Sequence, residues 1–269
     1  MQKFLIIQTA FIGDVVLATG LIEKIHQHYP DAHIDFLLRK GNEGLLQNHP
    51  LLHELLVWDK KKNKFAHLLQ MIGRVRRKKY DVLINVQRFA ATGLLTALSG
   101  AKRKIGFDKN PFSFLFSTAI PHQISGNGQS LHEIERNHWL IRDFTDKEPA
   151  LPTLYPADSD FVRVQEYKET PYLCISPASV WFTKQYPAEK WMALLSALPP
   201  NYRVYLLGAP GDKALAEQIR LGTSHANVIN LCGKLSFLQS AALMRDAVMN
   251  FVNDSAPMHF ASAMNAPVA

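Results

Sequence analysis

The first residue that could do chemistry is a carboxylate near the amino terminus, Asp14. An apolar run over residues 3–8 breaks at Ile12-Gly13-Asp14, and apolar residues then recur with a helical period. This pattern predicts a buried strand that feeds a helix. In open α/β folds, such a turn lies at the carboxyl edge of a parallel sheet, where ligands bind. We therefore expect Asp14 to lie at the mouth of a binding crevice.

Three polar segments in the second half of the chain could hold a phosphorylated ligand. They are Ser176–Pro187, which carries Lys184, then Leu207–Asp212 and Asn253–His259. A helix start offers unpaired N–H groups and a partial positive charge, and Lys184 would add a full one, which suits a diphosphate. Taken singly, Asp212, Asp254 and Ser255 are explained as helix caps, and His259 as a core residue. Their convergence at one sheet edge favours a site.

The elements that must position these residues alternate along the whole chain. Such alternation is typical of right-handed crossovers that build parallel sheets, so the predicted fold class is α/β. The expected strands are 3–8, 33–38, 55–58, 81–86, 103–106, 172–176, 202–207, 227–230 and 248–252. The expected helices are 14–28, 41–48, 64–77, 89–99, 131–143, 187–197, 211–221, 236–245 and 256–264.

The pattern divides into two similar halves. Residues 1–150 are expected to form one Rossmann-like domain, 151–170 a proline-containing linker, and 171–269 a second domain, with a cleft between the two. Residues 107–130 lack periodicity and are interpreted as a long loop beside that cleft. The chain stops at Ala269, where another buried strand starts, so a carboxyl-terminal segment is expected to be missing.

Composition narrows the class of protein. The chain has 269 residues, of which 47% are hydrophobic, and only two cysteines, Cys174 and Cys232, so neither a disulfide framework nor a zinc site is indicated. No apolar run approaches the length of a membrane span, and the amino terminus reads as a strand rather than a cleavable signal. These features predict a cytoplasmic protein.

The net positive charge of the chain lies in its first half. Residues 1–150 hold 21 Lys and Arg against 14 Asp and Glu, whereas the rest of the chain holds 9 of each. The basic runs around residues 60–64, 74–79 and 102–104 are either solvated surface or attract a polyanion. Nucleic acid, an anionic membrane face and a phosphorylated glycolipid would all respond to the same field.

Several short motifs resemble those of one family, glycosyltransferase family 9, the lipopolysaccharide heptosyltransferases. The resemblance runs in order from residue 3 to residue 269, and its last motif is the most specific. The motifs are Phe11-Ile-Gly-Asp14-Val, Tyr80-Asp-Val-Leu-Ile-Asn-Val-Gln87-Arg88, His132-Glu-Ile-Glu-Arg136-Asn, Pro177-Ala-Ser with Lys184 and Trp191, Gly208-Ala-Pro-Gly-Asp212, and Asp254-Ser-Ala-Pro-Met-His259.

The resemblance implies a GT-B fold, in which the first domain holds the acceptor and the second a nucleotide sugar. It assigns Asp14 as the general base and Arg88 and Arg136 to the acceptor side, with the loop 107–130. It also implies which residues bind each part of the donor. These are Lys184 and His259 for the diphosphate, Ser179 for a phosphate, Asp212 for the ribose and Leu235 for the adenine face, while Asp254 and Ser255 place the helix start under the diphosphate.

The implied reaction moves a heptose, or a related sugar, from ADP-heptose to an inner-core lipopolysaccharide acceptor with inversion. One carboxylate takes the acceptor proton, and positive charge stabilises the departing ADP. Lys184 and the helix dipole would replace a divalent ion, so we expect no metal and no cofactor. The partners expected are the nucleotide sugar, an anionic glycolipid and the inner membrane face, and not nucleic acid. Ala256 departs from the family, which usually has glycine there.

Two other classes of protein are the alternatives. A nicotinamide-dependent oxidoreductase would need Gly-x-Gly-x-x-Gly after the first strand, where this chain has a single glycine, Gly13. A non-catalytic binder of RNA or anionic glycolipid would use the basic first half, but the aromatic strands of RNA platforms and a terminal amphipathic anchor are missing.

Overall fold

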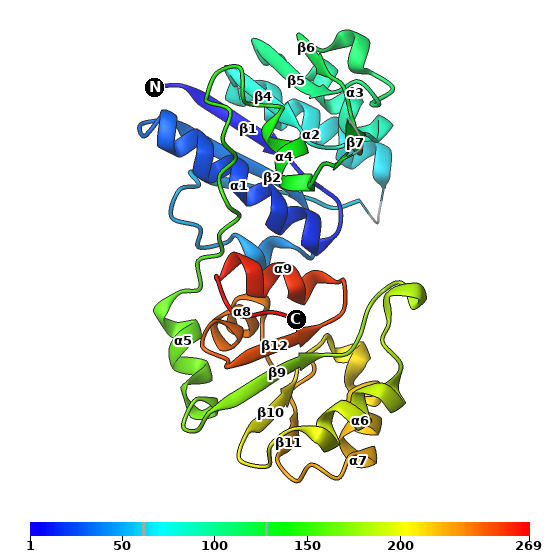
Figure 1. Ribbon diagram of the computed structural model, residues 1–269. Helices are drawn as coiled ribbons and strands as arrows, with labels where there is room; N and C mark the ends of the chain where they lie inside the picture. The colour runs from blue at the N-terminus through cyan, green and yellow to red at the C-terminus, as the bar shows by residue number, and fades with distance from the viewer. Residues whose placement is uncertain (61–62, 127–128) are drawn as a thin grey trace. The chain divides into compact units, whose positions relative to one another are not determined.

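The computed structural model describes residues 1–60, 63–126 and 129–269 and divides the chain into two compact units, Met1–Thr153 and Leu154–Ala269. Each unit has a parallel sheet with helices on both faces (Figure 1). None of the described helices is both long and apolar enough to cross a membrane.

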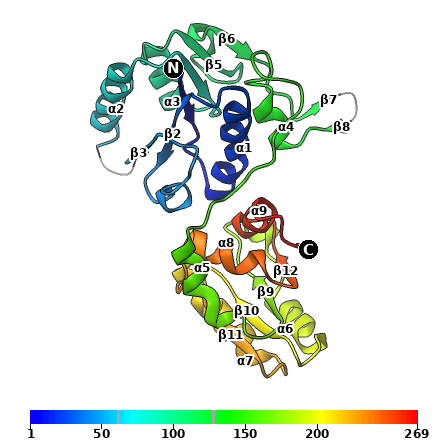
Figure 2. The same cartoon turned by 90° about the vertical axis from the view of Figure 1, so that its left-hand side faces the viewer.

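Unit 1 contains a six-stranded parallel sheet. From edge to edge its strands are β3 (Glu54–Trp58), β2 (His33–Arg39), β1 (Lys3–Ile7), β4 (Val82–Asn85), β5 (Arg103–Phe107) and β6 (Thr118–Ile120). This is the Rossmann order, in which the direction of strand addition reverses between β1 and β4. Figure 2 shows α2 (Lys64–Lys78) and α3 (Ala90–Leu98) on one side of the sheet, and α1 (Ile12–His28) and α4 (Glu133–His138) on the other.

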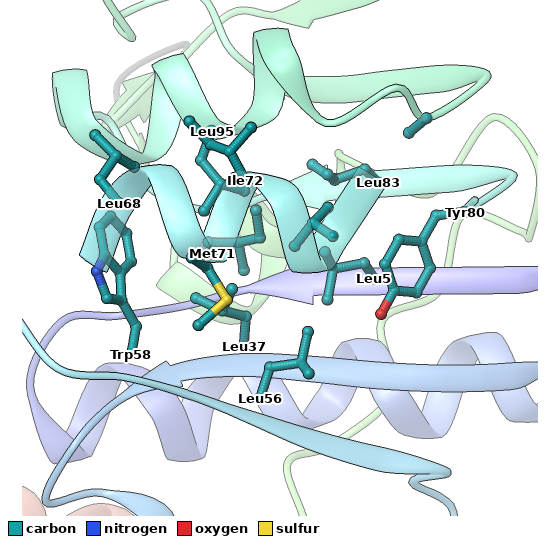
Figure 3. Close-up of a cluster of buried hydrophobic side chains, with 13 residues drawn as sticks. Leu5, Leu37, Leu56, Trp58, Leu68, Met71, Ile72, Tyr80, Leu83 and Leu95 are labelled. Atoms are coloured by element: carbon teal, nitrogen blue, oxygen red, sulfur yellow. The ribbon is translucent and has the colours of Figure 1, made fainter. Parts of the chain in front are cut away.

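The hydrophobic core beneath α2 explains why the apolar residues of that helix lie on one face. Its buried residues Leu68, Met71, Ile72 and Val75 share one stripe, whereas the opposite face is exposed. Figure 3 shows Met71 pointing toward the strands that carry Leu37 and Leu56. The central strands are apolar on both faces because helices cover both sides of the sheet.

Helix α1 is buried over more than one stripe. Every residue from Val15 to Ile22 is buried, because the segment that ends unit 1 covers the side of α1 away from the sheet. A Cβ added at Gly20 would lie 2.6 Å from the carbonyl oxygen of Ala150, and Thr19 Oγ1 accepts a hydrogen bond from the Thr153 N–H at 3.0 Å. The absence of a side chain at Gly20 therefore allows this close approach.

Unit 2 repeats the arrangement with four parallel strands. Their order is β11 (Val228–Asn230), β10 (Arg203–Leu206), β9 (Tyr172–Ser176) and β12 (Met249–Val252). In Figure 1, α6 (Ala188–Ala197) and α7 (Lys213–Gly222) cover one face, and α5 (Asp158–Val164), α8 (Phe237–Arg245) and α9 (Ala256–Ala263) the other. Residues 267–269 run parallel to β12 through backbone hydrogen bonds.

The predicted loop and linker hold more structure than periodicity indicated. Within 107–130 lie β6 and the two-residue strands β7 (Ser125–Gly126) and β8 (Gln129–Ser130), too short to show a period. Within 151–170, α5 packs on α8 in unit 2. The helix predicted over residues 131–143 is shorter in the structure, where α4 spans Glu133–His138. The 3-10 turns are η1 (Glu43–Leu45), η2 (Ser113–Leu115), η3 (Gln165–Tyr167), η4 (Phe182–Lys184) and η5 (Pro210–Asp212).

Candidate functional site

Unit 1 contains a cavity of about 1210 Å³ at the carboxyl ends of its strands. The residues that follow β1 to β4 all contribute to its wall, as do Phe107 at the end of β5 and three residues of α4. This is the edge at which open α/β sheets bind ligands, and it includes the reversal point between β1 and β4. The cavity is therefore the candidate site of unit 1.

Asp14 lines this cavity and is half-buried. Its Oδ2 accepts a hydrogen bond from the Phe11 N–H at 3.1 Å, which closes the first turn of α1. Oδ1 accepts no hydrogen bond from any residue that the structure describes. Asp14 thus caps its helix with one oxygen and keeps the other available, so the capping and proton-accepting roles do not exclude each other.

The charge in the cavity is mixed rather than purely basic. Arg39, Lys40, Lys60, Arg88 and Arg136 contribute cations, and Asp14, Glu43, Asp59 and Glu133 contribute carboxylates. The ammonium of Lys60 donates to Thr9 Oγ1 at 2.6 Å and lies 4.5 Å from the Trp58 ring centre. Burial, together with the nearby Arg39, lowers the pKa of Lys60 to about 8. Such a wall suits a ligand that carries both hydroxyls and anionic groups.

Helix α4 presents three polar residues to the cavity. Glu133, Arg136 and Asn137 share one helix face by their spacing, and Arg136 Nη2 lies 3.7 Å from Glu133 Oε2. Burial raises the pKa of Glu133 and the charge of Asp14 raises it further, whereas Arg136 and Arg88 oppose the shift. Arg88 is exposed at the rim. Arg88 and Arg136 were expected from the family resemblance, whereas Glu133 was not, although its helical spacing from Arg136 could have indicated it.

Two buried amides leave polar atoms unpaired at the cavity. Gln87 Nε2 donates to Gln8 Oε1, but Gln87 Oε1 and Asn137 Nδ2 have no hydrogen-bond partner among the described residues. Both side chains are more than nine-tenths buried. A buried polar atom without a partner costs about 1–3 kcal/mol, so a ligand hydroxyl that pairs with it would be favoured.

In unit 2, Lys184 and the start of α9 come together where β9 and β12 end. Lys184 Nζ lies 2.5 Å from Asp254 Oδ2. Asn253 connects the same two segments, because its Oδ1 accepts from the Tyr186 N–H at 3.1 Å and its Nδ2 donates to the Pro177 carbonyl at 2.8 Å. This pair of strands is the reversal point of the second sheet, so two of the three predicted segments meet at its ligand-binding edge.

The first turn of α9 is not closed by a side chain. Ser255 is the N-cap residue, but its hydroxyl donates to the Asn253 carbonyl at 3.3 Å, and the Asp254 carboxylate pairs with Lys184. The alternative interpretation, in which Asp254 and Ser255 only cap the helix, is therefore not supported, because neither side chain forms a cap hydrogen bond. Ala256 begins the helix with an ordinary negative φ, so its methyl group causes no backbone strain. His259 lies one turn further and is half-buried.

The remaining predicted donor residues lie at the same edge of the unit 2 sheet. Asp212 Oδ2 accepts a hydrogen bond from the Ala209 N–H at 2.7 Å, which is a capping geometry. Ser179 Oγ accepts from the Trp181 N–H at 3.3 Å within the loop after β9. Leu235 is half-buried, directly before the Ser236 cap of α8.

Two clusters of acidic residues are candidates for binding a metal ion. The sequence contains one Asp-x-Asp triplet of acidic residues at Asp158-Ser159-Asp160, where Asp160 Oδ2 accepts a hydrogen bond from the Ala157 N–H at the start of α5. Within the described ranges, the only group with metal-ligand spacing is Asp35, His53 and Glu54. It lies at the amino ends of β2 and β3, opposite the cavity, and the ammonium of Lys78 already donates to both carboxylates.

Comparison with known proteins agrees with this architecture. Residues 68–269 match glycosyltransferase family 9 (heptosyltransferase). Lipopolysaccharide heptosyltransferase 3 of Escherichia coli is 27% identical over 96% of this chain and 79% of its own length. The crystal structure of a family 9 glycosyl transferase from Veillonella parvula has a TM-score of 0.88 at 20% identity, covering 99% of this chain and 79% of that one. E. coli heptosyltransferase WaaC with ADP-2-deoxy-2-fluoro heptose has a TM-score of 0.77, also at 20% identity, covering 99% and 87%.

Two Rossmann-like units and the likeness to these solved structures show that the chain has the GT-B fold. The chain belongs to glycosyltransferase family 9, the heptosyltransferase family, and the family match spans most of its length. The predicted family and fold class are confirmed.

Proposed function

We propose that the protein transfers a heptose from ADP-heptose to an anionic lipopolysaccharide core acceptor, with inversion and without a metal ion. The observation that carries this proposal is that the reversal points of the two sheets carry different chemical groups. Asp14 keeps a free carboxylate oxygen at the unit 1 cavity, and unit 2 offers an uncapped helix start beside Lys184. Each edge supplies one of the two things that the reaction needs.

The reaction would proceed as a single displacement. The acceptor oxygen forms a bond to the anomeric carbon while the bond from that carbon to the diphosphate oxygen breaks, and ADP leaves with the electron pair. Asp14 Oδ1 receives the acceptor proton. Lys184 and the N–H groups of α9 stabilise the charge that develops on the diphosphate, the task for which other transferases use a divalent ion.

The relatives support the choice of substrates. An E. coli relative is named a lipopolysaccharide heptosyltransferase, and a structure with the same fold was solved with an ADP-heptose analogue. For this chain, Arg88 and Arg136 would bind anionic groups of the acceptor, and the unpaired amides of Gln87 and Asn137 would bind its hydroxyls. The basic surface of unit 1 would favour an acceptor held at the cytoplasmic face of the inner membrane.

The test combines two variants with ADP-heptose as donor and delipidated inner-core oligosaccharide as acceptor. Asp14→Asn should lower kcat by about 10³-fold while the Kd for ADP stays within about twofold, because only the proton acceptor is lost. Lys184→Met should chiefly raise the KM for the donor. The product's anomeric configuration by NMR should be inverted, and EDTA should leave turnover unchanged.

Asp31→Asn is the matched control, because Asp31 is an exposed carboxylate of the same unit outside the cavity. Turnover by Asp14→Asn at the wild-type rate would refute the assignment of the base. Turnover with UDP or GDP sugars, and none with ADP-heptose, would refute the donor.

A further inference from the structure

The outward side of α2 exposes two large apolar side chains. Phe65 is 85% exposed and Leu69 is 66% exposed, and their i and i+4 spacing places them side by side on the helix surface. Single exposed apolar residues are ordinary on a protein, whereas adjacent ones on one face indicate a site of interaction. This side of α2 is therefore a candidate docking surface outside the cavity.

Exposed cations continue the same side of the helix. Arg76 follows Leu69 by two helical turns, and its Nη1 donates to the Leu98 carbonyl at the end of α3 at 3.2 Å. The side chain of Leu98 is itself 41% exposed, so a third apolar group lies beside this guanidinium. Arg77 and Lys79 are exposed at the end of α2. The α2 surface is defined here as Phe65, Leu69, Arg76, Arg77, Lys79 and Leu98.

The charge of the α2 surface has one sign. The helix Lys64–Lys78 contains five Lys and Arg and no Asp or Glu. Two of these cations pair with Glu54. Arg76 and Arg77 form no ion pair with any residue that the structure describes. Lys104 adds a further cation, because its ammonium donates to a backbone carbonyl of α3 at 3.2 Å. The surface therefore combines exposed apolar groups with positive charge that no described carboxylate neutralises.

We propose that the α2 surface binds an anionic lipid bilayer, with α2 lying along the membrane plane. A basic helix with exposed aromatic and aliphatic side chains is typical of interfacial helices. Phe65 and Leu69 enter the boundary between the headgroups and the acyl chains, and the cations at the end of the helix contact lipid phosphates. Nucleic acid would use the charge and could stack a base on Phe65, but it offers no apolar layer for Leu69 and Leu98.

The position of this surface connects it to the cavity of unit 1. His67 Nδ1, in the first turns of α2, lies 2.9 Å from the carbonyl oxygen of Asp59, a residue that lines the cavity. The apolar end of the α2 surface is thus at the sheet edge that carries the cavity. The inference deepens the proposed function, because a bilayer bound here lies beside the edge at which a lipid-held acceptor is proposed to bind. Membrane binding itself needs no transfer reaction.

A fluorescent label at position 65 tests insertion directly. Phe65→Cys can be labelled with an environment-sensitive fluorophore, because the native Cys174 and Cys232 are buried. Vesicles with about 30% phosphatidylglycerol should shift the emission to the blue and raise its intensity about twofold, because the label leaves water. Vesicles of phosphatidylcholine alone and single-stranded RNA should not. Leu221→Cys, at a leucine of α7 that is 69% exposed, is the matched control and should show no shift.

Vesicle sedimentation of the unlabelled chain tests the apolar contribution. Phe65→Ser combined with Leu69→Ser should weaken binding to the anionic vesicles by about tenfold, because two large apolar groups no longer leave water. Leu221→Ser combined with Val162→Ser removes two exposed apolar side chains of unit 2 and should leave the affinity unchanged.

The same assay tests the electrostatic contribution. Arg77→Gln combined with Lys79→Gln should weaken binding by about tenfold and reduce its dependence on salt, because two phosphate contacts are lost. Lys147→Gln combined with Lys190→Gln removes two exposed cations outside the α2 surface and should change neither.

Failure of this inference can be distinguished from failure of the proposed function. Vesicle binding that neither substituted pair on α2 weakens, or binding of RNA without binding of vesicles, would overturn the role of the surface. Transfer from ADP-heptose to delipidated core oligosaccharide should stay at the wild-type rate in both pairs, since they lie outside the cavity. Vesicle binding by a wild-type chain that transfers no heptose would refute the proposed function alone.

Discussion

Asp14 illustrates how one side chain can meet a structural and a chemical requirement together. Its Oδ2 accepts a hydrogen bond from the Phe11 N–H, which fixes the orientation of the carboxylate, and Oδ1 accepts none from the described residues. In its proposed role as the base, Asp14 would need little reorganisation to reach the proton. Lys184 is likewise oriented by a neighbour, because it forms an ion pair with Asp254 beside the uncapped start of α9.

Lys60 makes the stability of the protein depend on pH. An unfolded lysine titrates near 10.5, whereas burial lowers the pKa of Lys60 to about 8 in the folded protein. Below pH 8 the amine is charged in both states and its burial cost is fully present. Between these two values the unfolded chain binds more protons, so the free energy of unfolding rises with pH.

Lys60→Met should therefore raise the free energy of unfolding by about 1 kcal/mol at pH 7, a value reduced because solvent reaches the amine. This gain should shrink as the pH approaches 10. Urea unfolding at both pH values measures it. Lys64→Met, at an exposed position on α2, is the control and should show no such trend. An equal gain at pH 7 and pH 10 would contradict the assigned titration.

At the scale of elements, α1 and α4 set the geometry of the cavity. Residues 150–153 cover α1 at Gly20 and Thr19, and α4 delivers Glu133, Arg136 and Asn137 to the wall. A shift of α1 would therefore move Asp14 relative to α4. The close approach at Gly20 is the contact most sensitive to an added atom.

Gly20→Ala should lower the free energy of unfolding by about 1–3 kcal/mol, because the new Cβ would lie 2.6 Å from a backbone oxygen that cannot easily move. Gly73→Ala in α2 is the matched substitution, where the added Cβ has no atom closer than 3.9 Å. It should raise stability by about 0.5–1 kcal/mol through helix propensity. Thermal and urea unfolding measure both, and equal effects of the two substitutions would contradict the packing argument.

At the scale of the whole molecule, the chain contains two parallel sheets of the same Rossmann-like arrangement. Both sheets place polar residues at the reversal point, but the first has carboxylates and cations around a cavity, and the second an open helix start with a lysine. The difference in chemistry suits different ligands. We propose that unit 1 serves the acceptor and unit 2 the nucleotide.

Hydrogen exchange of the full chain tests this division. Saturating ADP should slow exchange at residues 177–187 and 253–259 by about tenfold, since bound phosphate occupies their N–H groups. Segments 8–14 and 85–89 should exchange at the same rate with and without ADP. Protection by ADP around residues 8–14 and none at residues 253–259 would reverse the proposed assignment.

The order of residues along the chain was enough to predict the α/β class, nearly all strands and helices, and the sheet edges that carry Asp14 in unit 1 and Lys184 and His259 in unit 2. These follow from periodicity and from the rule that parallel strands end at one edge, so they need no knowledge of distant contacts. The short strand β6 and helix α5 escaped prediction, because their pairing and packing decide them rather than their period. Only the tertiary structure decided that Glu133 faces the cavity of Asp14 and that Lys184 pairs with Asp254. Residues far apart in sequence meet through packing of whole elements, and no local pattern records which of them come together.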